Sequence, residues 1–348
     1  QQIMSGIWAE ETQLPTIDQF ARHMPVSRMT LVRAIQLLRD QGLLITRGKG
    51  GTWVAADAAK PRIGLFGRLD FNRPGHAEFT YTLTNHIRQQ LVAQNFIPFS
   101  FNDTPPVICD NPSYDELCEA TKTGAISGLI DVFTRFPVWH ESQQEPLDVP
   151  MVHVGVQPAP QQVFFDTVAA INSAVNLLRN TDYRTIGLIG NLPPQQKWLL
   201  DKNSEHKTET RPQWIVVDHC QTGEEFGFQA LHKIWLACPR PRAIFVSDDV
   251  IAQGVAQAAL ALRINVPQEL LITCMGNEGI DRFYPCPVIR IDLSLNQLAA
   301  AAVKELTNML KNNTRSGTPK MISDFTVRTA DIPALTRFTE TAKLEQAM

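Results

Sequence analysis

The sequence lacks the features of membrane, secreted and metal-dependent proteins. No apolar run approaches the roughly 20 residues that a membrane-spanning helix needs, and the start at Gln1 does not resemble a secretion signal. The six cysteines are scattered, with no C-x-x-C pair and no histidine at zinc-ligand spacing. We therefore expect a cytoplasmic location, no disulfide framework, no metal and no cofactor.

Catalytic motifs are missing as well. The chain has no Gly-x-Ser-x-Gly elbow, no phosphate-binding glycine loop followed by lysine, and no histidine pair at metalloprotease spacing. Asp248 and Asp249 are adjacent, and at a helix start their side chains diverge by about 100°, so they do not form a catalytic dyad. The sequence indicates a protein that is not an enzyme.

The composition is that of an ordinary globular protein. The 348 residues are 44% hydrophobic and 19% charged, which excludes disorder, and the length favours two or three domains. The net charge is −3, but residues 16–54 hold six basic and two acidic side chains. This block therefore carries +4 and the remaining chain −7. Such an asymmetry suggests a polyanion-binding module attached to a larger body.

Residues 14–54 predict two helices and a hairpin. Thr16 and Gln19 can form a capping box for a helix over 17–23. A second helix is expected between Ser27, a good N-cap, and Gly42, which can take the left-handed conformation that ends a helix. A glycine-rich basic tip joins the two short strands that follow.

The second helix has an apolar side and a basic side. The apolar positions are Leu31, Ala34, Ile35 and Leu38, and the opposite positions are Arg28, Met29, Val32, Arg33, Gln36 and Arg39. A helix with a basic amino-terminal end, followed by a cationic hairpin, suits the major groove and phosphates of double-stranded DNA. The alternative is a solvated basic face on a small packing domain.

The order and spacing of several motifs resemble the winged helix-turn-helix of the GntR family. These motifs are Leu14-Pro15-Thr16, Val26-Ser27-Arg28, Ala34-Ile35, Gly42-Leu43 and Arg47–Val54. The resemblance implies the DNA-contacting residues Thr16, Ser27, Arg28, Met29, Thr30, Arg33, Arg47, Lys49 and Gly50. Asp18 and Val32 stand where the family often has arginine, and the wing has one extra glycine. We expect these departures to lower non-specific affinity or to change operator preference.

From residue 62 onward, short apolar runs alternate with helical stretches, which is typical of α/β domains with parallel, doubly wound sheets. The alternation restarts near Val163–Phe165, so two subdomains are expected, with ligand binding at the carboxyl ends of their strands.

The body resembles the LacI and periplasmic sugar-binding superfamily. The motifs that carry this resemblance are Arg62–Leu65, Arg184–Gly190, Asp248–Gly254 and Asn265–Glu269. The expected domains are a winged helix at 1–55 with a truncated amino-terminal helix, a linker at 56–61, an N-subdomain at 62–160 and 291–322, and a C-subdomain at 161–290 and 323–348. Three crossings between the subdomains are expected near 158–163, 289–292 and 321–324.

The same resemblance implies an effector site. Its candidate residues are Leu69, Asp70, Phe71, Phe79, Asp131, Asn191, Lys197, Trp198, Trp235, Asp248 and Asn277. Trp198 and Trp235 equally fit core packing, and Asp249 fits a helix cap better than a ligand contact. Gly276 stands where the family usually has the aspartate that binds a sugar hydroxyl. We expect either that Asn277 or Glu278 substitutes for it or that the effector differs from a simple hexose.

The combined hypothesis is a repressor similar to the arabinose-responsive regulators of sugar operons. It would bind operator DNA as a homodimer through helices near 78–94 and 224–236, and a small carbohydrate would control that binding. The rival hypotheses are a solute-binding protein without DNA binding and an enzyme that uses the interlobe cleft.

Overall fold

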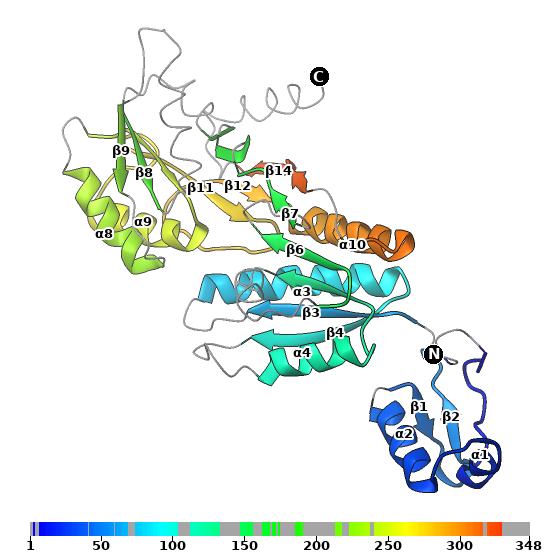
Figure 1. The fold of residues 1–348 in the computed structure, drawn as a ribbon. Helices are drawn as coiled ribbons and strands as arrows, with labels where there is room; N and C mark the ends of the chain where they lie inside the picture. Colours follow the sequence, from blue (N-terminus) through cyan, green and yellow to red (C-terminus); the bar gives the residue numbers. More distant parts are fainter. Residues whose placement is uncertain are drawn as a thin grey trace.

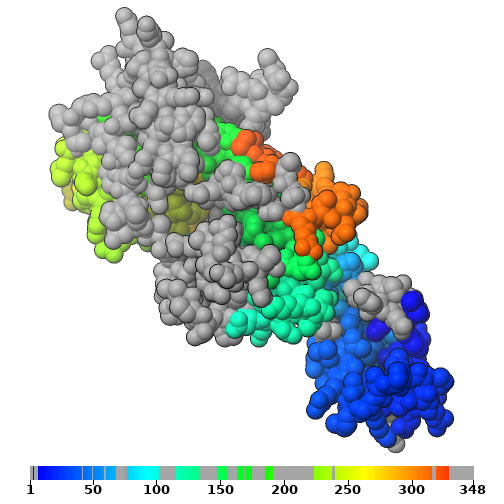
Figure 2. Space-filling view, viewed as in Figure 1, coloured from blue at the N-terminus to red at the C-terminus, as the bar shows by residue number. Residues whose placement is uncertain are grey.

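The computed structural model describes most of the two expected parts of the chain. The described residues are 7–40, 42–58, 60–68, 74–103, 112–132, 147–155, 162–167, 185–190, 213–217, 223–236, 240–315 and 319–328, together with Ile3 and 169–171 and 173–174. Figures 1 and 2 show a small head, in blue, at one end of an elongated body.

The head contains the predicted helices and hairpin. Its elements are α1 (Ile17–His23), α2 (Arg28–Asp40), β1 (Leu44–Thr46), the 3-10 turn η1 (Gly48–Gly50) and β2 (Thr52–Val54). β1 and β2 pair antiparallel, with Thr46 opposite Thr52. Leu14, Leu44 and Val54 are buried together, with Phe20, Ile35 and Leu38 packed against them, and Leu31 is buried as well. The predicted apolar side of α2 therefore packs into the head core.

The body is built on two six-stranded sheets. The first has the order β13 (Lys320–Ile322), β7 (Gln162–Phe165), β6 (Met151–Gly155), β5 (Gly128–Val132), β3 (Arg62–Arg68) and β4 (Ile97–Asp103). The second has the order β14 (Phe325–Arg328), β12 (Ile289–Leu293), β11 (Leu271–Asn277), β10 (Ala243–Val246), β8 (Thr185–Ile189) and β9 (Gln213–Val217). All neighbours are parallel except β12 and β14. The doubly wound fold is confirmed.

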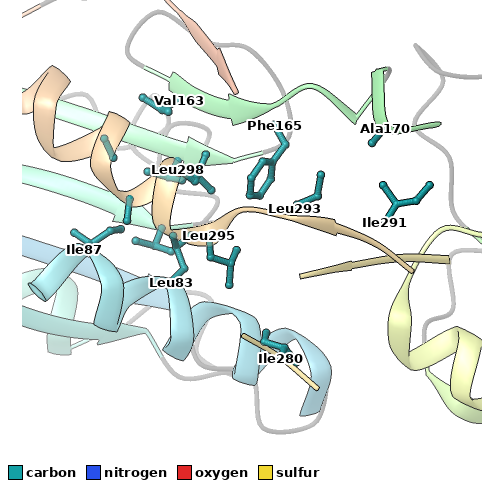
Figure 3. Packing of buried hydrophobic residues seen from close by; sticks show 14 of the residues in the cluster. Leu83, Ile87, Val163, Phe165, Ala170, Ile280, Ile291, Leu293, Leu295 and Leu298 are labelled. Carbon is teal, nitrogen blue, oxygen red and sulfur yellow. The ribbon is translucent and has the colours of Figure 1, made fainter. Parts of the chain in front are cut away.

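Helices cover the sheets, and one apolar core runs through both lobes. α3 (Pro74–Ala93) and α10 (Leu295–Asn312) pack together on the first sheet, and α4 (Pro112–Lys122) packs against β4. α8 (Glu224–Trp235) and α9 (Asp249–Ala261) pack on the second sheet. Figure 3 shows Leu83 on α3 beside Leu295 on α10, with Phe165 and Leu293 continuing the cluster toward Ile291.

The crossings between the lobes differ in part from the sequence-based expectation. β7 does not open the second lobe, because Val163 and Phe165 are buried in the core below α10 and β7 pairs with β6 and β13. β12 lies wholly in the second sheet, whereas α10 packs on the first, so the chain crosses at Ser294. The third crossing, expected near 321–324, does lie between β13 and β14.

The segment expected to be a linker is folded onto the head. Ala58 is completely buried in the head core, and the Ala55 amide donates to the Leu43 carbonyl. Arg62, the first residue of β3, is itself buried and donates from Nη2 to the Gly42 carbonyl over 3.2 Å. Gly42 ends α2 with φ of +68°, so the body's first strand touches the carboxyl end of this helix.

Candidate nucleic-acid interface and interlobe site

Local side-chain caps fix the two helices of the head. Thr16 and Gln19 form the predicted capping box, in which each side chain accepts a hydrogen bond from the other residue's backbone amide. Ser27 Oγ accepts from the Thr30 amide over 3.1 Å and lies 2.8 Å from the Thr30 hydroxyl. α2 therefore begins at Arg28, as predicted, with its first turn held in a defined conformation.

The outward side of α2 presents a mixed surface. Met29, Val32 and Arg33 are exposed, which fits the side assigned to DNA. Arg39 differs, because its Nη2 donates to the Thr52 hydroxyl over 2.9 Å and ties α2 to β2. Arg39 therefore supports the hairpin instead of extending the basic surface.

The wing, formed by β1, η1 and β2, is a tight hairpin whose tip is fixed by side-chain hydrogen bonds. Gly48 and Gly51 have φ of +50° and +86°, a region where other residues are strained, so the tip requires glycine at both positions. The Gly50 carbonyl accepts two hydrogen bonds, from Gln13 Nε2 over 2.7 Å and from Trp53 Nε1 over 2.8 Å. These bonds fix the backbone that carries Lys49.

Two arginines assigned to DNA contact have acidic partners. Arg28 Nη1 lies 3.2 Å from Asp18 Oδ1 on α1. Arg47 Nη2 lies 2.6 Å from Glu11 Oε1, and its guanidinium sits 5.1 Å from the centre of the Trp53 ring. The basic surface is therefore partly neutralised from within the head.

All nine residues assigned to DNA contact belong to the head. They are Thr16, Ser27, Arg28, Met29, Thr30, Arg33, Arg47, Lys49 and Gly50. The side chains of Thr16, Ser27 and Thr30 are engaged in caps, whereas Met29 and Arg33 project outward. Their contact with DNA stays a prediction.

In the body, the adjacent aspartates before α9 have roles opposite to those expected. Asp248 is the N-cap, and its Oδ1 accepts from the amides of Val250 and Ile251 over 2.9 and 3.1 Å. Asp249, expected to cap, is instead almost fully buried. The sequence pattern locates the helix start correctly but misassigns the cap by one residue. The cap uses only Oδ1 of Asp248, and the assignment of this residue to effector binding stays a prediction.

Asp249 belongs to an ionic cluster that joins the lobes. Arg282, in the loop after β11, lies 2.7 Å from Glu78 on α3 of the first lobe and 3.5 Å from Asp249 of the second. Burial and the neighbouring charge of Asp248 raise the pKa of Asp249 to about 6, while Arg282 opposes this shift. No sequence signal singled out Glu78 or Arg282, because their partners are distant in the chain.

The glycine that replaces the family's aspartate makes room for an ion pair. A Cβ on Gly276 would meet Asp292 Oδ1 and lie 2.8 Å from Arg290 Nη2. Arg290 binds Asp292 over 2.7 Å and donates to the carbonyls of Asn277 and Ile280. The pair therefore holds the end of β11 at Asn277 and the start of the loop that carries Arg282.

The remaining described effector candidates come from different elements of the body. Asp131 on β5 is buried, and its Oδ2 lies 2.9 Å from His153 Nδ1 on β6. Phe79 packs against the core. Trp235 ends α8 and packs beside Arg240, before β10 begins, so it lies at the amino-terminal edge of the second sheet, away from the end at which Asp248 follows β10. The candidates Leu69, Asp70, Phe71, Asn191, Lys197 and Trp198 lie outside the described residues.

Neither a metal site nor a membrane span is found where the structure describes the chain. No group of three His, Cys, Asp or Glu side chains there could hold an ion. No helix among those residues has both the length and the apolar character needed to cross a bilayer.

Comparisons with known proteins agree with this division of the chain. Residues 1–54 match the model of the bacterial regulatory proteins of the gntR family, and residues 175–329 match the periplasmic binding protein-like domain. The chain joins a gntR-type head to a periplasmic binding protein-like body. This combination is the one that the sequence motifs indicated.

Two of the relatives are named as operon regulators. A ribose operon repressor of Haemophilus influenzae is 33% identical over 147 residues, or 40% of this chain and 43% of the relative. The NTD biosynthesis operon regulator of Bacillus subtilis is 30% identical over 117 residues, or 34% of each chain. The matches thus span less than half the length of these relatives.

Solved structures confirm the fold of the body. A lac repressor dimer bound to operator and the anti-inducer ONPF superposes with a TM-score of 0.60 at 15% identity, covering 78% of this chain and 94% of that one. A LacI-family regulator from Enterococcus faecium with bound ribose gives 0.55 at 19% identity, covering 78% and 97%. At these identities the similarity establishes the fold of a gntR-headed, periplasmic binding protein-like chain and nothing about its ligand.

Proposed function

We propose that the protein is a transcription regulator, a repressor, whose affinity for operator DNA is controlled by a small molecule held between the two lobes. The main support for this proposal is the head, which has a capped helix with an exposed outer side and a wing fixed by hydrogen bonds. This head is joined by a hydrogen bond from Arg62 to a body of two lobes. A helix of this kind fits the major groove, and the wing fits the adjacent backbone. The relatives are named as operon regulators, which supports a regulatory role over an enzymatic one.

For the effector we propose a carbohydrate or a related polyol. Carboxylates and amides pair with hydroxyl groups, and aromatic rings cover the apolar face of a sugar. Support comes from the relative named a ribose operon repressor and from the structural neighbour with bound ribose. The residues proposed for this site are Leu69, Asp70, Phe71, Phe79, Asp131, Asn191, Lys197, Trp198, Asp248 and Asn277.

Control would act through the equilibrium between two lobe arrangements. A ligand shifts such an equilibrium only by its difference in affinity for the two states, and coupling of about 1–3 kcal/mol changes operator affinity about 5–150-fold. The Glu78–Arg282 contact supports a closed arrangement, because separating the lobes would break it.

We further propose a cytoplasmic homodimer. A twofold protein reads a near-palindromic operator with half-sites about one helical turn apart or a multiple of it. The candidate interface helices are α3, which exposes Tyr81 and Val92, and α8.

The test begins with selection of duplex DNA by the purified protein from a randomised pool. We expect one enriched, near-palindromic sequence, and we expect Arg33→Ala to weaken its binding. Thermal-shift screening of pentoses, hexoses, uronates and nucleosides follows, since a ligand at 100 times its Kd adds about 2.7 kcal/mol of stability. Absence of any enriched sequence would overturn DNA binding. If no sequence is enriched but a sugar raises the melting temperature, the result favours a solute-binding protein.

A further inference from the structure

The two arginines with acidic partners form one pattern on the surface assigned to DNA. Arg28 opens the recognition helix α2 and pairs with Asp18, whereas Arg47 begins the tip of the wing and pairs with Glu11. In both pairs the carboxylate comes from the chain before α2. The side chains remain 45–69% exposed, so DNA can reach both guanidinium groups.

Neither pair is needed to build the head. The Thr16–Gln19 capping box starts α1 and Ser27 caps α2 without help from Asp18. The wing is braced at the Gly50 carbonyl by Gln13 and Trp53 without Glu11. Exposed ion pairs contribute little to folding stability, so a structural role does not account for both carboxylates.

The carboxylates compete with DNA phosphates for the same cations. A guanidinium binds carboxylate and phosphate through the same parallel N–H donors. When DNA displaces the carboxylate, the arginine exchanges one anion for another, and an unpaired carboxylate is left near the phosphates. Arbitrary DNA therefore gains little from either arginine.

Operator DNA offers more than a phosphate. An arginine at the start of a recognition helix can bind a guanine edge through two hydrogen bonds, which arbitrary sequence does not provide in register. Only this additional contact offsets the loss of the carboxylate partner. The internal pair therefore penalises arbitrary DNA more strongly than operator DNA.

We propose that Asp18 and Glu11 are specificity-determining residues. Their carboxylates pair with Arg28 and Arg47 and thereby weaken the binding of these arginines to arbitrary DNA. The proposal rests on the DNA-binding function proposed above. It also gives a physical reason for an acidic residue at position 18, where related heads often carry arginine.

The test compares the wild type with Asp18→Asn, Glu11→Gln and the double variant in the full chain. Binding to a random-sequence duplex and to the selected operator is measured from 50 to 200 mM KCl. Each freed arginine should make the slope of log K against log salt more negative by about 0.9 on the random duplex. We expect affinity for that duplex to rise roughly 3–10-fold per variant at 50 mM KCl, where one added phosphate contact counts most, and the operator-to-random ratio to fall.

Two further variants separate pairing from other effects. Asp40→Asn removes one negative charge from α2, where Asp40 binds the Gln36 amide and no arginine, so its slope should stay near that of the wild type. Asp18→Glu keeps the carboxylate and should restore wild-type slope and ratio. Circular dichroism melting checks that every variant head is folded.

Two results would overturn the proposal. Equal slopes for Asp18→Asn and Asp40→Asn would show that only net charge matters. A loss of operator affinity in Asp18→Asn, with an unchanged slope on random DNA, would show that Asp18 itself contacts a base. Failure of the wild type to bind any duplex is a different result, because it removes the proposed function and not the pairing.

Discussion

Ion pairs in the head and in the body occupy different environments. In the head, Arg28–Asp18 and Arg47–Glu11 lie on the surface. In the body, the side chains of Arg290 and Asp292 are at most 8% exposed, and Asp249 is buried beside Arg282. The head pairs are thus accessible to an external anion, whereas the body pairs fix internal geometry.

The difference follows from solvation. An exposed pair gains about 0–1 kcal/mol because water screens its charges, whereas removing one partner of a buried pair leaves an uncompensated charge and costs about 3–5 kcal/mol. We therefore expect body substitutions to act on folding and head substitutions to act on DNA binding.

The largest effect is expected for Arg290→Met. This change removes the 2.7 Å partner of Asp292, which keeps Arg328 Nε at 2.8 Å, and it removes the donors to the Asn277 and Ile280 carbonyls. The body should lose up to about 3–5 kcal/mol of unfolding free energy in urea. The matched change Arg28→Met in the head should cost at most about 1 kcal/mol. Equal losses in the two variants would contradict the comparison.

A smaller effect, dependent on pH, is expected at Asp249. Its folded-state pKa of about 6 lies above its ordinary value of 3.8, so the folded protein takes up a proton before the unfolded chain does. The ionised carboxylate therefore destabilises the fold above pH 6, and this penalty disappears as the pH falls from about 7 to 4. Because Arg282 keeps Glu78 as its closer partner at 2.7 Å, Asp249→Asn leaves no unpaired cation and should raise stability at pH 7.5 by up to about 3 kcal/mol.

Urea midpoints at pH 7.5 and 4.5 check this expectation. The wild-type midpoint should contain a component that rises toward low pH, and Asp249→Asn should lack that component. Asp115→Asn, an exposed change in the first turn of α4, serves as control. A pH dependence that survives in Asp249→Asn would assign the effect to another group.

Local signals explain what the sequence could predict. The Thr16–Gln19 capping box, the Ser27 cap and the Gly42 terminus each depend on residues within a few positions, and all three appear in the structure. Alternating apolar runs likewise predicted two parallel sheets, because strands buried on both faces are continuously apolar.

Long-range pairing explains what the sequence could not predict. The alternation of strands and helices along the chain is the same whichever sheet β7 joins. Its pairing with β6 depends on the burial of Val163 and Phe165 in the core, which the alternation does not indicate. The Arg290–Asp292 pair gives no periodic signal, although it explains Gly276. Asp18 was recognised as a departure from the family, but its contact with Arg28 depends on how α1 packs on α2.

The buried pair can also be disturbed without removing either charge. Gly276→Ala would place a Cβ against Asp292 and Arg290, and overpacking of this kind costs about 1–3 kcal/mol. Gly67→Ala is the matched change in a strand of the first lobe, where the nearest atom, Thr80 Cγ2, lies 3.4 Å away. We expect a clearly lower melting temperature only for Gly276→Ala. Similar melting temperatures would show that the ion pair can move aside.

The smallest effect on stability is expected where head and body meet. Arg62→Gln removes the 3.2 Å hydrogen bond to the Gly42 carbonyl, and one such bond contributes about 1 kcal/mol, or roughly a fivefold change in a docking equilibrium. Arg242→Gln is a matched control, because Arg242 also precedes a parallel strand and donates to a loop carbonyl, that of Gln268, within the body. Nuclear spin relaxation of head amides should show the wild-type head tumbling with the body and the Arg62→Gln head tumbling faster. If the head of Arg242→Gln changes equally, or if neither head changes, then Arg62 does not hold the recognition helix against the first strand of the body.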